Sequence, residues 1–100
     1  YANAVRRFVA ALVSATSAAR RDPSGATSIM AQASQYKVQF LQRSVPYTLS
    51  LLAPPAGLKT GCISEASWQG FGNWMKRNNL IKITPDAGLI STDRYLPYRC

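Results

Sequence analysis

The side chains able to do chemistry in this sequence are two cysteines, four acids and twelve Lys or Arg residues, with no histidine. Without histidine the chain has no imidazole for acid/base catalysis and no Cys–His or Ser–His–Asp arrangement. A zinc site built from Cys and His ligands is excluded on the same ground. We therefore expect no enzyme, no cofactor, and no catalytic, cofactor-binding or metal-binding residue. Each acid has a local use as a cap, a first-turn acid or a turn residue: Asp22, Glu65, Asp86 and Asp93.

Two further sequence motifs are too incomplete to predict a ligand-binding site. Gly70-Phe71-Gly72 lacks the third glycine and the preceding strand of a dinucleotide fingerprint, and no phosphate loop ending in Gly-Lys-Ser/Thr is present. An aromatic stripe at helical spacing would stack nucleic-acid bases if it were exposed. Such stripes are more often core, so we expect this one to be buried. Its members are Trp68, Phe71, Trp74 and Met75.

The two cysteines, Cys62 and Cys100, are compatible with one disulfide or with two free thiols. A disulfide would indicate an oxidising compartment. Cys62 lies just before the expected helix around Trp68, and Cys100 ends a tail expected to return along that helix. An antiparallel return would bring the two cysteines together, so we favour the disulfide. A Cα separation beyond about 7 Å would exclude it.

The net charge of +8 makes nucleic acid, an acidic membrane surface or an acidic partner the candidate binding partners. The arrangement of the charges weakens this interpretation, because no run of four basic residues occurs. Scattered pairs and single basic residues are typical of a solvated surface. The pairs are Arg6-Arg7, Arg20-Arg21 and Lys76-Arg77.

The length of 100 residues is that of one domain, so we expect residues 1–100 to form a single unit. With 47% apolar and 16% charged residues, the composition is typical of a packed globular piece. No stretch approaches the ~20 apolar residues that span a bilayer. The sequence opens on Tyr1-Ala2-Asn3, almost inside a helix, which favours a segment cut from a longer protein. Such a segment would expose the face that met its missing neighbour.

Apolar periodicity predicts helices in the first half of the chain. A helix over 3–21 has a stripe at i, i+3, i+4 and i+7 spacing, with Asn3 as its N-cap. Asp22-Pro23 predicts the start of a second helix, which runs to about Ser34. Its expected inner face is Ile29, Met30 and Ala33.

The rest of the chain predicts two further helices and a tail. Over 35–53 we expect a helix kinked or broken near Pro46, and we favour it over a strand at the alternating residues 36–40. After a loop at 54–63, a helix starts at Ser64 and stops at Asn78-Asn79, and the tail 89–100 is extended. The expected fold class is all-α, with about four helices plus an extended C-terminal tail.

The last forty residues carry motifs beyond this periodicity. The helix reads Ser64-Glu-Ala-Ser-Trp68-Gln69 and then Asn73-Trp74-Met75-Lys76-Arg77-Asn78-Asn79-Leu80-Ile81, and it is followed by Ile83-Thr84-Pro85-Asp86 and Ser91-Thr92-Asp93-Arg94-Tyr95-Leu96-Pro97. This order resembles the carboxyl end of nitrate/sulfonate/taurine-type substrate-binding proteins of ABC importers, a family that includes thiamine-pyrimidine-precursor binders.

The front half agrees with the same family. Asn3-Ala4-Val5-Arg6-Arg7-Phe8-Val9-Ala10-Ala11-Leu12 is similar to the family helix that usually reads Asn-Pro-Glu-Ala-Val-Arg-Ala-Phe, and Asp22-Pro23 is similar to the helix start that follows it. The likeness covers nearly the whole chain in the correct order. Three departures leave the subfamily and the solute open: Asn78-Asn79 replaces a glycine turn, Asp93-Arg94 replaces Asn-Glu, and Pro46 interrupts a continuous helix.

The resemblance implies a C-terminal helical segment derived from a two-lobed α/β periplasmic-binding-protein fold. Whole proteins of this kind clamp a small anionic or organic solute between their lobes and deliver it to an ABC permease, in a periplasmic or other extracytoplasmic location. Their solute contacts lie upstream of the matched segment, so no binding residue is carried over. The segment itself is expected to bind no solute and no nucleic acid, and to form homo-oligomers through its uncovered face.

Two other functions compete with this interpretation. A basic helical nucleic-acid-binding module would present one contiguous basic face and bind with a steep salt dependence. Its phosphate contacts would come from the three basic pairs and its stacking from Trp68 or Trp74. A secreted helical protein acting on membranes or on another protein is the third interpretation.

Overall fold

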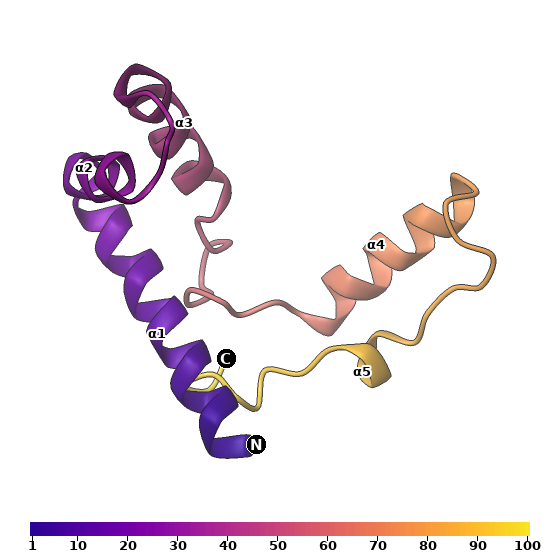
Figure 1. Cartoon of the computed structure of the whole chain (residues 1–100). Coiled ribbons are helices and arrows are strands. Elements are labelled where there is room, and N and C mark those ends of the chain that lie inside the picture. Colours follow the sequence, from indigo (N-terminus) through magenta and orange to yellow (C-terminus); the bar gives the residue numbers. More distant parts are fainter.

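The computed structural model describes all 100 residues and contains five α-helices and no strand (Figure 1). The all-α prediction is therefore confirmed, and the strand considered at 36–40 is absent. No helix is long and apolar enough to cross a membrane. The helices are α1 (Ala2–Arg21), α2 (Pro23–Ala33), α3 (Val38–Leu51), α4 (Glu65–Arg77) and α5 (Ala87–Ile90).

Capping side chains define the starts of three of the five helices. The Asp22 carboxylate accepts a hydrogen bond from the Gly25 N–H at 3.0 Å, and the Ser64 hydroxyl accepts one from the Ser67 N–H at 3.1 Å. Both N-caps were predicted from the sequence, because Asp and Ser satisfy the free N–H groups of a first turn. The prediction of Asn3 as N-cap is wrong: α1 begins at Ala2, and its N-cap Tyr1 makes no side-chain capping bond.

Helix α4 ends in a left-handed turn at the predicted Asn78-Asn79 stop. Asn79 has φ 58°, a conformation that asparagine tolerates better than most residues. The Leu80 N–H reaches back to the Met75 carbonyl at 2.9 Å, and the Asn79 N–H reaches the Lys76 carbonyl at 3.1 Å. This pair of bonds is the Schellman motif, in which asparagine takes the position usually held by glycine.

Three of the six buried residues lie where α2 packs against α3, and the other three are Cys62, Gly72 and Ala87. Leu41 is 2% exposed and Val45 is 6% exposed, and Thr27 of α2 is also buried, with its hydroxyl donating to the Pro23 carbonyl at 2.8 Å. The predicted inner face of α2 is wrong, because Ile29 and Met30 are exposed. The helix is short and rich in small residues, so it turns its Thr27 face rather than its bulkiest side chains toward α3.

Helix α3 runs through Pro46 as one element, where a kinked or broken helix was expected. Proline removes one intrahelical hydrogen bond and crowds the preceding turn. Burial of Leu41 and Val45, which lie on the N-terminal side of Pro46, fixes this helix against α2 and outweighs that cost. Tertiary packing therefore decides the outcome over local propensity.

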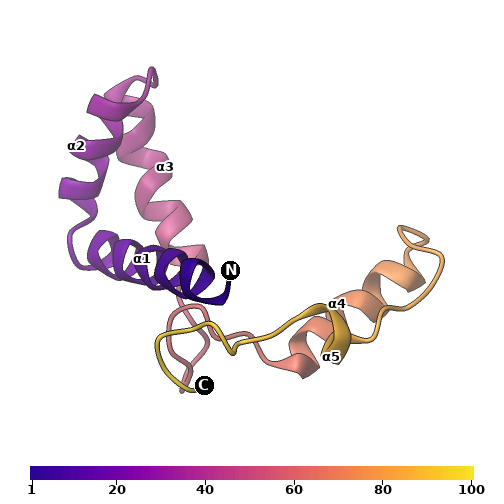
Figure 2. The same ribbon diagram turned by 60° about the horizontal axis from the view of Figure 1, so that its bottom comes forward.

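The helices form two arms that meet at an elbow (Figures 1 and 2). The first arm is α1–α3 and the second arm is α4–α5, and no helix of one arm contacts a helix of the other. The elbow consists of the loop 52–64 and the tail 91–100, which returns from α5 to α1. The radius of gyration of 16.5 Å exceeds the roughly 13 Å usual for 100 residues. The chain is thus much more open than an ordinary domain of its length.

The second arm is held together by one polar side chain and one glycine. The Gln69 side chain donates to the Pro85 carbonyl at 3.0 Å and accepts from the Ala87 N–H at 3.0 Å. Gly72 is buried, and a Cβ at this position would lie only 2.9 Å from Pro85 Cγ. The segment before α5 therefore packs directly on the backbone of α4. Leu89 and Ile90, predicted as part of the extended tail, belong to α5, and the chain from Ser91 onward is non-helical.

Candidate functional site

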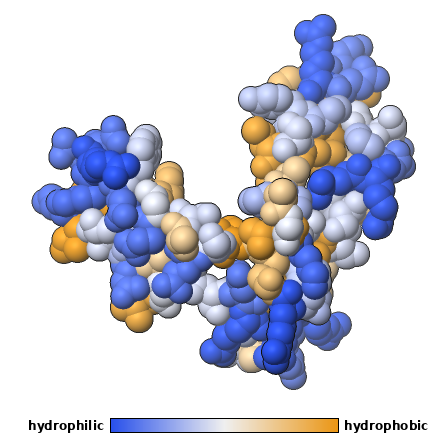
Figure 3. Space-filling model, turned by 180° about the vertical axis from the view of Figure 1, so that it is seen from behind, coloured by the Kyte–Doolittle hydropathy of each residue, from blue (hydrophilic) through white to orange (hydrophobic).

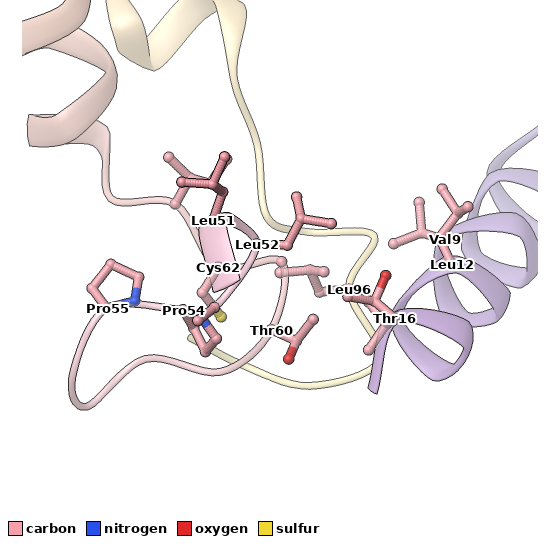
Figure 4. A pocket seen from close by; sticks show the side chains of 14 residues that line it. Val9, Leu12, Thr16, Leu51, Leu52, Pro54, Pro55, Thr60, Cys62 and Leu96 are labelled. Carbon is pink, nitrogen blue, oxygen red and sulfur yellow. The ribbon is translucent and has the colours of Figure 1, made fainter. Parts of the chain in front are cut away.

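An apolar groove of about 430 Å³ lies at the elbow (Figure 4). Helix α1 supplies one wall, the end of α3 and the following loop supply another, and Leu96 of the tail completes the groove. Its polar side chains are two threonines and the bridged Cys62, so it offers no acid, base or ion ligand. The lining residues are Val9, Leu12, Val13, Thr16, Leu51, Leu52, Ala53, Pro54, Pro55, Thr60, Gly61, Cys62, Ile63 and Leu96.

A disulfide between Cys62 and Cys100 fixes the shape of the elbow. The two Cα atoms are 5.8 Å apart, inside the limit set for a bridge, and Cys62 is buried. The disulfide ties the end of the tail to the loop that follows α3. The bridge therefore closes residues 62–100, which include the whole second arm, into a covalent ring.

Polar contacts reinforce this junction. The Tyr98 hydroxyl donates to the Thr60 carbonyl, and the Lys59 ammonium group donates to the Arg99 carbonyl at 3.4 Å. The same ammonium group lies 5.0 Å from the centre of the Tyr98 ring, which adds a cation–π interaction. Each contact joins the loop to the last three residues of the tail.

Gly61 permits the close approach of Leu96. It has φ +86°, a conformation that side chains with a Cβ rarely adopt, and a Cβ there would lie 3.0 Å from Leu96 Cδ2. Leu96 can therefore lie against the loop backbone and form the floor of the groove near Val13. The conformation of a single glycine thus determines how the tail meets α1.

Large apolar side chains remain exposed along both arms. Phe8 of α1 is 65% exposed, although it lies in the stripe that predicted a buried face. Figure 3 shows apolar residues gathered at the junction of the arms and along the first arm. The accessible surface is 7971 Å², against about 5,600 Å² for a compact protein of this length. The surplus of about 2,400 Å² is comparable to the area that obligate interfaces bury.

The aromatic stripe of α4 is not core in this chain, and that prediction is wrong. Phe71 is 50% exposed and Trp74 is 47% exposed, while Trp68 and Met75 are half-buried. The Phe71 and Trp74 rings stack with their centres 5.9 Å apart. Because successive helical residues rotate by about 100°, Phe71 and Trp74 lie on the opposite side of α4 from Gln69 and Gly72. Helix α4 contacts Pro85 and Ala87 with one face and leaves the aromatic face uncovered.

The basic residues are all exposed, and the three basic pairs lie on separate parts of the molecule. Arg6-Arg7 and Arg20-Arg21 stand at opposite ends of α1, roughly 20 Å apart at 1.5 Å per residue. Lys76-Arg77 lies at the end of α4 in the other arm. The three pairs named as phosphate contacts therefore do not form one contiguous face.

Two of the four acids serve as helix caps. Asp22 and Asp86 accept hydrogen bonds from the N–H groups of Gly25 and Gly88 at helix starts. One further proximity could not be predicted from the sequence: Glu65 and Asp93 line the same small hollow of about 140 Å³. No group of three His, Cys, Asp or Glu side chains is placed to hold a metal ion.

Comparison with protein-family models, curated proteins and solved structures gives no match for this chain. The groove at the elbow is therefore interpreted from its structure alone. It is apolar and uncovered, and the Cys62–Cys100 disulfide fixes its shape. Sequence reasoning singled out Cys62 and Cys100 but missed Gln69 and Leu96, because their roles depend on the return path of the tail. Gln69 and Leu96 contact residues that are far away in the sequence, so no local sequence pattern indicates these contacts.

Proposed function

We propose that this chain is the C-terminal helical segment of an extracytoplasmic solute-binding protein that delivers a small anionic or organic solute to an ABC importer. The order of motifs along nearly the whole sequence supports this assignment. So does the all-α architecture, in which the helices follow one another with the expected starts at Asp22-Pro23 and Ser64.

The observation that carries most weight is the uncovered apolar surface. A chain that was complete as a monomer would bury side chains such as Phe8, Phe71 and Trp74, because each buried side chain of this kind contributes about 1.5–3 kcal/mol. Here they line the outside of an open molecule. The two α/β lobes of a solute-binding protein would cover them and fill the apolar groove at the elbow.

The disulfide supports an extracytoplasmic location, periplasmic in a bacterium with two membranes. Disulfides persist in oxidising compartments and are rare in the cytosol. The Cys62–Cys100 bridge is also supported by neighbouring contacts at Thr60 and Tyr98, so it is part of the elbow rather than an isolated pair.

Solute binding is assigned to the missing lobes and not to this segment. Open α/β sheets bind ligands in the crevice at the carboxyl ends of their strands, and this chain has no strand. The elbow groove offers apolar walls with few polar groups, which does not suit a small anion. The whole protein, and not this segment alone, would bind the permease.

The test extends the chain at its N-terminus with the residues that its gene encodes before Tyr1. We expect about 200 preceding residues with alternating strands and helices, as suits two lobes of ordinary domain size. The extended protein should be monomeric and should gain thermal stability from one of a panel of sulfonates, nitrate and pyrimidines. A reading frame that starts close to Tyr1, or an extension without strands, would overturn the assignment.

The nucleic-acid alternative is favoured by two observations, the charge of +8 and the exposed stack of Phe71 on Trp74. It predicts that affinity for a single-stranded oligonucleotide falls steeply with salt and falls again in W74A. The transport assignment predicts only weak binding that W74A leaves unchanged.

A further inference from the structure

A second hollow lies where the tail crosses the first turns of α1 (Figure 1). It has a volume of about 450 Å³ and differs from the elbow groove in having charged residues among its apolar ones. Three of its seven lining residues are arginines. The full set is Arg6, Arg7, Ala10, Arg94, Tyr95, Leu96 and Pro97.

The fold brings these arginines together from opposite ends of the sequence. Arg6 and Arg7 lie in the second turn of α1, and Arg94 lies in the tail. The tail is held in place by the Cys62–Cys100 disulfide and by the seat of Leu96 against Gly61. Their proximity is therefore a consequence of the elbow and not of local sequence.

Arg94 is positioned by its neighbours. Its guanidinium carbon lies 4.7 Å from the centre of the Tyr95 ring, within the range of a cation–π interaction. Its backbone N–H donates to the Thr92 hydroxyl at 3.3 Å. A stacked guanidinium keeps its N–H donors free at the edge of the plane, where they can meet an anion.

No acid compensates the three charges. The lining of the hollow contains neither Asp nor Glu. Asp93, the sequence neighbour of Arg94, lines the separate hollow that also contains Glu65. Three like charges around one hollow repel one another unless an anion enters, and such an arrangement raises the local concentration of anions.

We propose that this hollow binds a phosphate group. A guanidinium pairs with phosphate through two parallel N–H···O bonds, and the tetrahedral group has enough oxygens to accept from more than one arginine at once. A carboxylate has two oxygens, fewer than a phosphate group offers. Three arginines around one hollow therefore match phosphate better than a carboxylate. The group can belong to free phosphate or to a lipid headgroup.

The experiment titrates the intact, oxidised chain at low ionic strength with two probes. Calorimetry measures binding of inorganic phosphate and pyrophosphate, and cosedimentation measures binding to phosphatidylcholine vesicles with and without phosphatidylglycerol. The variants are R94Q and R7Q, and the matched control is R21Q, which removes the same charge at the far end of α1. Circular dichroism checks that each variant keeps its helices.

We expect R94Q and R7Q each to weaken binding about tenfold or more, since each removes a charge-assisted hydrogen bond, and R21Q to change it less than about twofold. Loss of phosphate binding in R94Q supports the site with free phosphate as its source. Vesicle binding that needs phosphatidylglycerol and is lost in R94Q supports the site with a headgroup as its source. Absence of binding to both probes, or equal losses in R21Q and R94Q, overturns it. Neither probe depends on the assignment to a solute-binding protein.

Discussion

Removing the Cys62–Cys100 disulfide should destabilise the chain strongly. The two cysteines are separated by 38 positions in the sequence. Closing a loop of this length in the unfolded chain lowers its entropy by an amount equivalent to about 4 kcal/mol at 25 °C. A domain of this size has a total stability of only about 5–15 kcal/mol. Loss of the bridge should therefore lower the melting temperature by roughly 15–30 °C.

The assay is urea unfolding followed by circular dichroism at 222 nm, for the oxidised protein, the reduced protein and C62S/C100S. We expect the reduced protein and the double variant to agree, with midpoints about 1–4 M below that of the oxidised protein. Agreement between the two distinguishes loss of the bridge from an effect of the serines. A difference in unfolding free energy below about 1 kcal/mol would refute this reasoning, because it would mean that the tail is not held by the bridge.

Three further predictions follow from the same geometry. G72A should destabilise the chain by about 1–3 kcal/mol, because its Cβ would meet Pro85, whereas G70A has open space and should stabilise α4 by up to about 1 kcal/mol in urea unfolding. The chain should self-associate in analytical ultracentrifugation, and F8S should reduce this association while changing the unfolding free energy by less than about 0.5 kcal/mol; a strictly monomeric parent would contradict this. Taurine, nitrate and pyrimidines should show no saturable micromolar binding in calorimetry, and such binding surviving in R94Q would contradict the assignment of the solute site to the missing lobes.

Local signals in the sequence predicted the boundaries of α2 and α4 well. The Asp22-Pro23 and Ser64-Glu65 starts and the Asn78-Asn79 stop depend on hydrogen bonds within one or two turns, so the necessary information lies in neighbouring residues. Helix α3 was harder to predict, since the effect of Pro46 depends on how firmly Leu41 and Val45 pack on α2. That balance involves another helix and cannot be read from the local pattern.

The features of the candidate site were predictable only in part. The disulfide requires the tail to return to Cys62. The sequence indicated this possibility because its second cysteine, Cys100, is the last residue of the tail. The meeting of Arg94 with Arg6 and Arg7 could not be foreseen, because it joins residues from opposite ends of the chain. Their pattern is that of scattered surface charges until the elbow brings them together.

The apolar stripes of α1 and α4 were wrongly predicted to be buried, and this is the most informative difference between prediction and structure. Periodicity reports which face of a helix is selected for burial, and it carries no information about what covers that face. Helix α4 illustrates this difference, because it packs against the segment at Pro85 and Ala87 through Gln69 and Gly72, a polar residue and a glycine. Its aromatic face, with Phe71 and Trp74, takes no part in that contact and remains about half exposed. A helix that keeps its large apolar face out of the internal contacts is best explained by a partner surface, which under the proposed function is the rest of the solute-binding protein.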